Sequence, residues 1–306
     1  MRLSEVLQLS VNGVVNGCFY GLMGIAFGLI YSVTERFHYA IQVSVMLAAY
    51  IALAVHDGGV PLLFAIAAGL LVAALFGPLV ETAVYRPVIA RNPNALMLIF
   101  VASLGLATLC ENLARIVWTS NSRPFPTGFE VSPIELGSGV TLTSLELVTI
   151  VVTVAIAVGI SVFLARSEQG RAMRAIRANL DLARAVGIDT RRVFTLAFAL
   201  GSLVAGVGGV IFAMRFAAEP GMGHVPTFMA FVVCFVAGAG STPVRFLVVG
   251  LLIGLFESLS NLWLRAQWNE VVVFAVLFAY VALLPLLQGR RIQWRPRRPK
   301  TAMGSV

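Results

Sequence analysis

The sequence predicts an all-α integral membrane protein, a polytopic bundle of eight or nine transmembrane helices with one short or re-entrant segment. Of its 306 residues, 59% are hydrophobic and 12% charged, with a mean hydropathy of +0.91. Soluble domains carry about 25% charged residues. The apolar residues form runs near the ~20 residues that cross a bilayer. The basic residues gather in short segments between these runs, so the net charge of +8 does not indicate nucleic-acid binding.

The candidate spans follow one another with short connections. The first is interpreted as a retained span rather than a signal peptide, because its apolar run is not followed by a small-residue cleavage site. The seventh is short, and with the Gly- and Pro-containing stretch after it we expect a re-entrant or broken helix. The candidate stretches are residues 11–33, 38–56, 61–80, 95–117, 144–165, 193–215, 226–241, 244–264 and 271–287.

The arginines predict the orientation. They collect in residues 81–94, 166–192 and the C-terminal tail, which are therefore expected on the cytoplasmic side. The parity of the intervening spans agrees with this placement. Residues 118–143 carry one base, Arg123, and are expected outside, and the three spans before residue 81 then place the N-terminus outside.

No motif indicates an enzyme. The three cysteines stand alone in apolar runs, so neither a disulfide framework nor a metal site is predicted. The only lysine, Lys300, follows Pro299, so the GxxxxGK[ST] phosphate-binding loop is absent. The chain is expected to bind no cofactor and to have no ATPase site of its own. Three histidines, His38, His56 and His224, lie at predicted span edges and are expected to be interfacial.

Residues 171–189 differ from their apolar surroundings. Four arginines at the centre of a bilayer would cost roughly 10 kcal/mol, so this segment lies outside it. Apolar and small residues recur at spacings of three and four, which predicts one face of a single helix ending near a glycine. These residues are Met173, Ile176, Leu180, Ala183 and Gly187.

Two functions fit such a helix. It can lie on anionic lipid as a basic amphipathic helix, or it can dock into a cytoplasmic partner. The small side chains of Ala183 and Gly187 slightly favour docking, because they leave a shallow groove for another protein. A lipid-binding face usually carries Phe, Trp or more Leu.

Small residues at spacings of four predict close packing between helices. We expect ordinary packing of this kind rather than a specific dimer face. The series are Gly13, Gly17 and Gly21; Gly201, Ala205, Gly209 and Ala213; and Gly250 with Gly254.

The stretch "GRAMRAIRANLDLARAVGIDTRRVFTLAFALGSLVAGVGGVIFA" resembles the cytoplasmic loop and following span of the LivH-type permeases, the membrane subunits of ABC importers for branched-chain amino acids and related compounds. The resemblance to this family extends to the first span and to the stretches "YRPVIARNPNALMLIFVASLGLATLCENLARIVWTSNSRPFP" and "GLLIGLFESLS". It therefore covers most of residues 9–290. The matching loop positions are Gly170, Ala172, Arg174, Ala175, Ala183, Gly187 and Ile188.

Two stretches depart from that family. Where the family usually has Asn-Phe-Ala-His-Gly at the start of its second span, this chain has residues 38–42, "HYAIQ". Where the family has Gly-Gly-x-Gly-Ser-x-x-Gly, it has "GAGSTPVR" at 238–245. Both lie where the family's transport path is expected, so the resemblance supports a permease more strongly than it supports one substrate.

The resemblance implies a single permease domain over residues 1–306, with a cytoplasmic ATPase-docking loop at 166–192 and a basic cytoplasmic tail at 288–306. It implies a multi-pass protein of the bacterial cell inner membrane, forming the path for a small polar solute. Branched-chain amino acids are the leading substrate; urea or short amides are alternatives. A secondary transporter, which would show an inverted repeat, and a membrane-embedded enzyme are further alternatives.

The implied partners are a second permease subunit, homologous or identical, two cytoplasmic ATP-binding subunits that use the ATP, an external solute-binding protein and membrane lipid, but no nucleic acid. The expected docking residues are Arg174, Arg177, Leu180, Ala183 and Gly187.

Four polar residues are candidates for the translocation path: Asn12, Asn16, Glu111 and Glu257. Glu257 is the strongest, because an ionisable group inside a span usually faces a cavity or another polar group. Glu111 and Arg115, four residues apart, are expected to pair along one helix face. Asn12 and Asn16 are one turn apart, and hydrogen bonding between helices is the alternative role for them.

Overall fold

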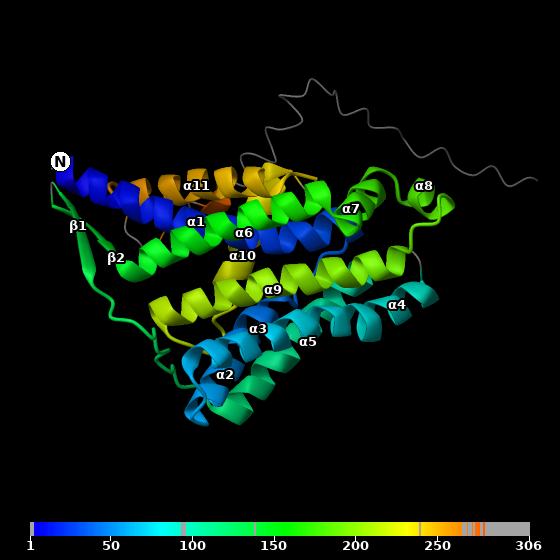
Figure 1. The fold of residues 1–306 in the computed structure, drawn as a ribbon, viewed down its shortest axis with the longest axis horizontal. Coiled ribbons are helices and arrows are strands. Elements are labelled where there is room, and N and C mark those ends of the chain that lie inside the picture. Colours follow the sequence, from blue (N-terminus) through cyan, green and yellow to red (C-terminus); the bar gives the residue numbers. More distant parts are fainter. Residues whose placement is uncertain are drawn as a thin grey trace, which may run out of the picture.

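The computed structural model describes residues 3–92, 96–137, 139–238 and 240–264, together with 268, 271, 273–275 and 278. These residues form a bundle of long helices with a two-stranded hairpin at one end (Figure 1). The predicted last span, 271–287, falls largely outside the described residues, and the predicted basic tail at 288–306 does so entirely.

The described elements follow the predicted spans closely. They are α1 (Leu3–Thr34), α2 (Ile41–Asp57), α3 (Leu62–Val80), the π-helical turn η1 (Glu81–Tyr85), α4 (Arg86–Arg91), α5 (Leu96–Trp118), β1 (Pro133–Gly137), β2 (Val140–Thr143), α6 (Ser144–Arg166), α7 (Glu168–Ala178), α8 (Leu180–Ala185), α9 (Thr190–Phe216), α10 (His224–Ala237) and α11 (Pro243–Ser260).

The helical membrane architecture is confirmed, with one β-hairpin in addition and a refinement in helix lengths. Six described helical stretches are long and apolar enough to cross a bilayer, against the eight or nine spans predicted. Two further apolar helices are shorter. With 17 and 14 residues, α2 and α10 measure only about 25 and 21 Å, less than the ~30 Å hydrocarbon core. The predicted short segment at 226–241 corresponds to α10.

The two ends of the bundle carry different elements (Figure 1). At one, which we call the basic end, lie α4, α7 and α8, and Arg86 there donates a hydrogen bond to the Arg191 carbonyl over 3.0 Å. At the other, the hairpin end, lie the start of α1 and the strands, where the Gln8 amide donates to the Thr141 carbonyl over 2.9 Å. The positive-inside rule predicts that the basic end faces the cytoplasm.

Close backbone contact joins α1 to α11, as the glycine spacing predicts. A Cβ atom added to Gly17 would lie 2.6 Å from the Leu251 Cα, and one added to Gly13 would lie 2.9 Å from the Leu255 Cα. Gly254 packs in turn on the backbone of Gly13 and Gly17. The absent side chains therefore let the two backbones touch.

The long helix α9 crosses the middle of the bundle and contacts α1, α2 and α3 (Figure 1). A Cβ on Gly201 would lie 2.7 Å from the Ala26 carbonyl oxygen of α1. Gly209 sits directly on the Val45 backbone of α2. The small residues of α9 are thus used for packing inside one chain, as predicted.

The prediction of a single helix over 171–189 is wrong, because the segment forms two helices. Asn179 has an extended backbone (φ −162°, ψ 110°) between α7 and α8, and its side chain accepts a hydrogen bond from the Leu182 N–H over 2.9 Å. Asparagine competes with the helical backbone in this way and so favours a new N-cap. Gly187, at φ +85°, follows the end of α8, as expected for a glycine stop.

The packing of this segment also contradicts the shallow groove that we expected at Ala183. Its side chain is 3% exposed and packs in a cluster with Met173, Ile176, Val193 and Phe194. The apolar face of α7 and α8 therefore points into the protein, toward α1 and α9. The large apolar side chains that α8 and the residue after it expose are Leu182 and Val186, at 61% and 69%.

Replacing Gly17 by alanine is expected to destabilise the fold. The added methyl would meet backbone atoms of α11, which no rotamer change can move, so we expect a loss of about 1–3 kcal/mol. The thermal unfolding midpoint in detergent measures this. Gly159→Ala on α6 is the matched control, because nothing lies within 4 Å of its added Cβ. Equal midpoints for the two variants would contradict the packing argument.

Candidate functional site

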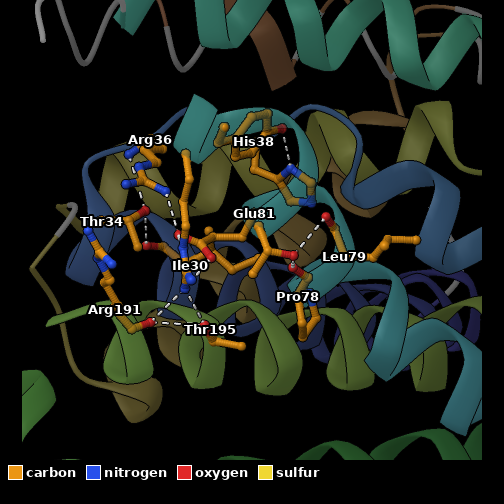
Figure 2. A network of polar contacts seen from close by, with 12 residues as sticks. Ile30, Thr34, Arg36, His38, Pro78, Leu79, Glu81, Arg191 and Thr195 are labelled. Carbon is orange, nitrogen blue, oxygen red and sulfur yellow. Dashed lines mark hydrogen bonds and ion pairs between the residues drawn. The ribbon is translucent and has the colours of Figure 1, made fainter. Parts of the chain in front are cut away.

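A buried ion cluster lies where α1, η1 and α9 meet at the basic end (Figure 2). The Glu81 carboxylate, 1% exposed, pairs with Arg36 Nη1 over 3.1 Å and with Arg86 Nη2 over 2.7 Å. A buried carboxylate is stable only when its charge is compensated and its oxygens accept hydrogen bonds. Two guanidinium groups from different segments compensate the charge, and Glu81 Oε1 accepts hydrogen bonds from Arg36 Nη1 over 3.1 Å and from Arg86 Nε over 2.9 Å.

The cluster ties three parts of the chain together. Besides Glu81, Arg86 donates to the Thr195 hydroxyl of α9 over 2.6 Å. The Arg36 N–H donates to the Thr34 hydroxyl at the end of α1 over 3.3 Å. In η1, the backbone N–H of Arg86 donates a hydrogen bond to the Glu81 carbonyl, five residues earlier. This π-helical turn is wider than an α-helical turn and holds one extra residue.

The connection 35–40 between α1 and α2 is held by these contacts and by its own. The buried His38 Nδ1 and the Tyr85 hydroxyl share a hydrogen bond of 2.6 Å. The Tyr39 N–H donates to the Ser103 hydroxyl of α5 over 3.2 Å. The expectation that His38 is interfacial is therefore wrong, since its ring is fully buried. The connection positions Tyr39 at the start of α2.

Tyr39 begins a chain of polar contacts that crosses from α2 to α10 and α5. Its hydroxyl lies 3.1 Å from His224 Nδ1, and His224 Nε2 lies 2.8 Å from Glu111 Oε2. Arg115 donates to Glu111 Oε1 over 2.5 Å, so the predicted Glu111–Arg115 pair is confirmed. Because a carboxylate only accepts, His224 Nε2 is the donor, and in the neutral ring Nδ1 then accepts from Tyr39. We call Tyr39, Gln42, Glu111, Arg115 and His224 the polar junction.

The junction lies where the two short helices begin. A Cβ on Gly223, the residue before α10, would lie 2.5 Å from the Gln42 carbonyl oxygen in the first turn of α2. The helices then run to opposite ends of the bundle. Asp57 at the end of α2 pairs with Arg123 of the hairpin-end segment, and Ser241 beyond α10 contacts Arg177 of α7.

It follows that both helix N-termini meet inside the membrane. Neither helix is long enough to cross it alone, and their other ends lie on opposite sides. Helix N-termini carry partial positive charge and attract anionic groups. Paired broken helices of this kind form midplane substrate sites in transporters, where irregular backbone lines a cavity.

A small cavity of about 10 Å³ lies within the junction, room for about one water molecule. Gln42 is 4% exposed, and its Oε1 has no hydrogen-bond partner within the described part of the chain. An unsatisfied buried amide costs free energy until something pairs with it. The cavity is lined by Gln42, Val43, Met46, Ala107, Glu111, Pro220, Gly221, Gly223 and His224.

An aromatic layer lies between the junction and the basic end. Phe37 of the 35–40 connection packs against Phe231 of α10, with ring centroids 4.5 Å apart, and against Phe100 of α5 at 5.0 Å. Phe27 of α1 contacts Phe231 at 4.6 Å. Since Phe231 follows His224 by seven residues, it lies about 10 Å further along α10 toward the basic end.

The other predicted path residues lie elsewhere. The Asn12 side chain accepts a hydrogen bond from Gln8, and Asn16 accepts one from Arg215 of α9 over 3.1 Å. Glu257 is 7% exposed on α11. These three residues belong to the α1–α11 pair, whereas α2, α5 and α10 build the junction. A path role for them stays a prediction.

Sequence reasoning missed three junction residues. His224 was expected to be interfacial, but its ring bridges Tyr39 and Glu111. Tyr39 and Gln42 carry no pattern that marks them, although they fall in the "HYAIQ" stretch at the expected path. Across the described residues, no group of three His, Cys, Asp or Glu side chains meets as metal ligands would.

The chain is similar to known proteins over most of its length. Residues 9–281 match the family model described as "Branched-chain amino acid transport system / permease component". The chain is similar to the high-affinity branched-chain amino acid transport system permease proteins BraD of Pseudomonas aeruginosa (29% identity, covering 93% of this chain and 95% of the relative) and LivH of Escherichia coli K12 (26%, 91% and 94%). LivH of Salmonella typhimurium is 28% identical, with 91% and 94% covered. No solved structure matches the chain significantly.

Replacing Glu81 by glutamine is expected to destabilise the protein strongly. Arg36 and Arg86 would lose their shared counter-charge in a buried site, and breaking such pairs costs about 3–5 kcal/mol. Thermal unfolding in detergent measures the loss. Glu168→Gln removes an exposed carboxylate 4.0 Å from Arg171 and should change stability by less than about 1 kcal/mol. Similar unfolding midpoints in the two variants would show that the cluster is not needed for stability.

Proposed function

Because the chain belongs to the family of branched-chain amino acid transport system permease components, we propose that it is the membrane subunit of an ABC importer whose path carries branched-chain amino acids. It is a multi-pass inner-membrane protein and acts as a transport subunit. The observation that carries the proposal beyond the family is the polar junction, where two helix N-termini, a carboxylate and an apolar wall meet inside the membrane.

A zwitterionic amino acid matches the chemistry of the junction. Its carboxylate is attracted by the N-termini of α2 and α10. Its ammonium group can donate to the buried Gln42 Oε1 and to the Glu111 carboxylate. Its aliphatic side chain can contact Val43, Met46 and Ala107 on the same wall. Urea and short amides lack the apolar part, so this wall favours a branched-chain substrate over them.

The volume of the cavity implies a closed state. About 10 Å³ does not hold an amino acid, so the junction must widen for one to pass. The aromatic layer of Phe27, Phe37, Phe100 and Phe231 blocks the way toward the basic end. In the proposed cycle these rings separate when α10 moves, and the substrate is then released on that side.

Movement of α10 requires a link to an energy source. Arg177 of α7 contacts the Ser241 carbonyl in the α10–α11 connection, so a shift of α7 is transmitted to the end of α10. We infer that the energy comes from two ATP-binding subunits docked at the basic end, with ATP bound by them and not by this chain. A second permease subunit, homologous or identical, and an external solute-binding protein complete the proposed importer.

The docking surface is proposed on the exposed side of α7 and α8. Arg174 and Arg177 are exposed there, as is Gly187 beyond α8. Because Ala183 is buried and Leu180 half-buried, we propose that Leu182 and Val186 make the apolar contacts with the ATP-binding subunits instead. The alternative is that these residues rest on anionic lipid.

Removing the charge of Glu111 is expected to lower uptake about tenfold or more, because a charge-assisted hydrogen bond to substrate is worth about 1.5–3 kcal/mol. The test is uptake of radiolabelled leucine into proteoliposomes that contain the complete importer, with Glu111→Gln and His224→Gln. Labelled urea is measured in parallel, and the expected result is no ATP-dependent urea uptake by the unaltered protein.

Glu130→Gln is the control, since it removes a carboxylate at the hairpin end, outside the junction. Assembly with the ATP-binding subunits is checked by size-exclusion chromatography for each variant. Normal leucine uptake by assembled Glu111→Gln would rule out the junction as the substrate site.

A charge at Leu182 is expected to prevent binding of the ATP-binding subunits. Leu182→Asp places an anion on an exposed apolar contact and leaves the buried face of α8 unchanged. Co-purification of the ATP-binding subunits should fall to background. Val131→Asp, the same kind of change at an exposed position at the hairpin end, should leave it intact. If the lipid alternative holds, both variants will retain the ATP-binding subunits.

A further inference from the structure

A large arginine-lined cavity opens at the basic end, apart from the polar junction. Its volume is about 600 Å³, which falls in the range of sites for small organic ligands. The wall comes from η1 and α4 on one side and from α8 and the start of α9 on the other. Its lining residues include Arg36, Glu81, Arg86, Arg184 and Arg191.

The charge of this cavity is strongly positive. Four guanidinium groups face one carboxylate, which leaves a net formal charge of +3 on the lining residues. Glu81 is already shared by Arg36 and Arg86. Among the described residues, the one carboxylate that pairs with Arg184 is that of Asp181, 3.7 Å away and 94% exposed. Such a pair compensates little charge.

Arg191 is the least compensated of the four. Its carbonyl accepts hydrogen bonds from Arg86 and Thr195, but within the described residues its guanidinium has no hydrogen bond or ion pair. The Asp189 carboxylate caps the N-terminus of α9 and pairs with Arg192 instead. An anion in the cavity would therefore meet Arg184 and Arg191 with their charges largely available.

The surroundings indicate which anion fits. The cavity lies at the end of the apolar stretch Leu62–Arg91, at the height of a bilayer surface. Leu75 and Leu79 are each 60% exposed, and Thr82, three residues beyond Leu79, lines the cavity. These residues form a strip on one helix face that leads from the membrane interior to the arginines. A molecule with an anionic head and an acyl chain matches both parts.

We propose that this cavity binds the phosphate headgroup of an anionic phospholipid from the leaflet at the basic end. The phosphate lies between Arg184 and Arg191, and one acyl chain follows Leu75 and Leu79. Basic pockets beside transmembrane helices on the cytoplasmic side bind anionic headgroups in this manner. The bound lipid would join α8 to α3 and neutralise the excess charge next to Glu81. This proposal depends on which end of the bundle is basic, and it does not depend on which substrate is transported.

The test is lipid binding to the purified full-length chain by native mass spectrometry. Dioleoylphosphatidylglycerol and dioleoylphosphatidylcholine share their acyl chains and differ in net charge. We expect the anionic lipid to bind about tenfold more tightly to the unaltered protein, and the double variant Arg184→Gln, Arg191→Gln to lose about that factor. Both arginines lie outside the contacts with Glu81, so the fold should be retained.

The control removes the same number of charges outside the cavity. Arg171→Gln with Arg192→Gln replaces two exposed arginines of α7 and α9 and should change affinity by less than about twofold. Millimolar inorganic phosphate is added in a third series and should not displace the lipid.

Several results would overturn the proposal. Equal affinity for the two lipids would show that the charge of the headgroup does not determine binding. An equal loss in the control would indicate general attraction to the basic end. Displacement by phosphate would assign the cavity to a free anion. Loss of the ATP-binding subunits when the double variant is co-purified with them, with lipid binding unchanged, would assign the cavity to that partner.

Discussion

The buried Glu81 carboxylate, paired with Arg36 and Arg86, is the interaction on which the arrangement of the other elements depends (Figure 2). It joins the end of α1, the π-helical turn after α3 and the first turns of α9, beside the arginine-lined cavity. Two guanidinium groups facing one buried carboxylate restrict the geometry of the cluster, and through Arg36 they constrain the 35–40 connection. That connection carries His38 and Tyr39, and through Tyr39 it sets where α2 begins.

The start of α2 inside the membrane requires a partner, because backbone and polar groups there cannot turn to water. The start of α10 supplies it: Gly223 allows contact with Gln42, and His224 joins Tyr39 to Glu111. Two incomplete spans thus become one membrane crossing with a polar break. The glycines of α1, α9 and α11 make this possible, since close packing of the long helices holds the short ones in place.

The polar break and the basic end are connected through α10. One end of this helix forms the junction, and the other leads to Ser241, which contacts Arg177 of α7. Aromatic rings fill the space between. A partner that displaces α7 would therefore act on the rings and the junction through one rigid helix. The arginine-lined cavity lies beside this region, between α4 and α8, where a bound lipid would limit how far α8 can move.

The sequence by itself determined the membrane class, the positions of the described long spans, the short seventh span, the segregation of arginines to a few segments and the family. The first four depend on local composition and spacing, which tertiary contacts do not alter, and the family follows from the resemblance of whole stretches of sequence. Only the tertiary structure showed that Asn179 divides the basic segment, that Ala183 faces inward, and that Tyr39, Gln42 and Glu111 meet His224. These residues are between 3 and 185 positions apart along the chain, and a lone polar residue in an apolar run looks the same whether it faces a partner, a cavity or the surface. Which of these it faces is decided by the helices that pack around it.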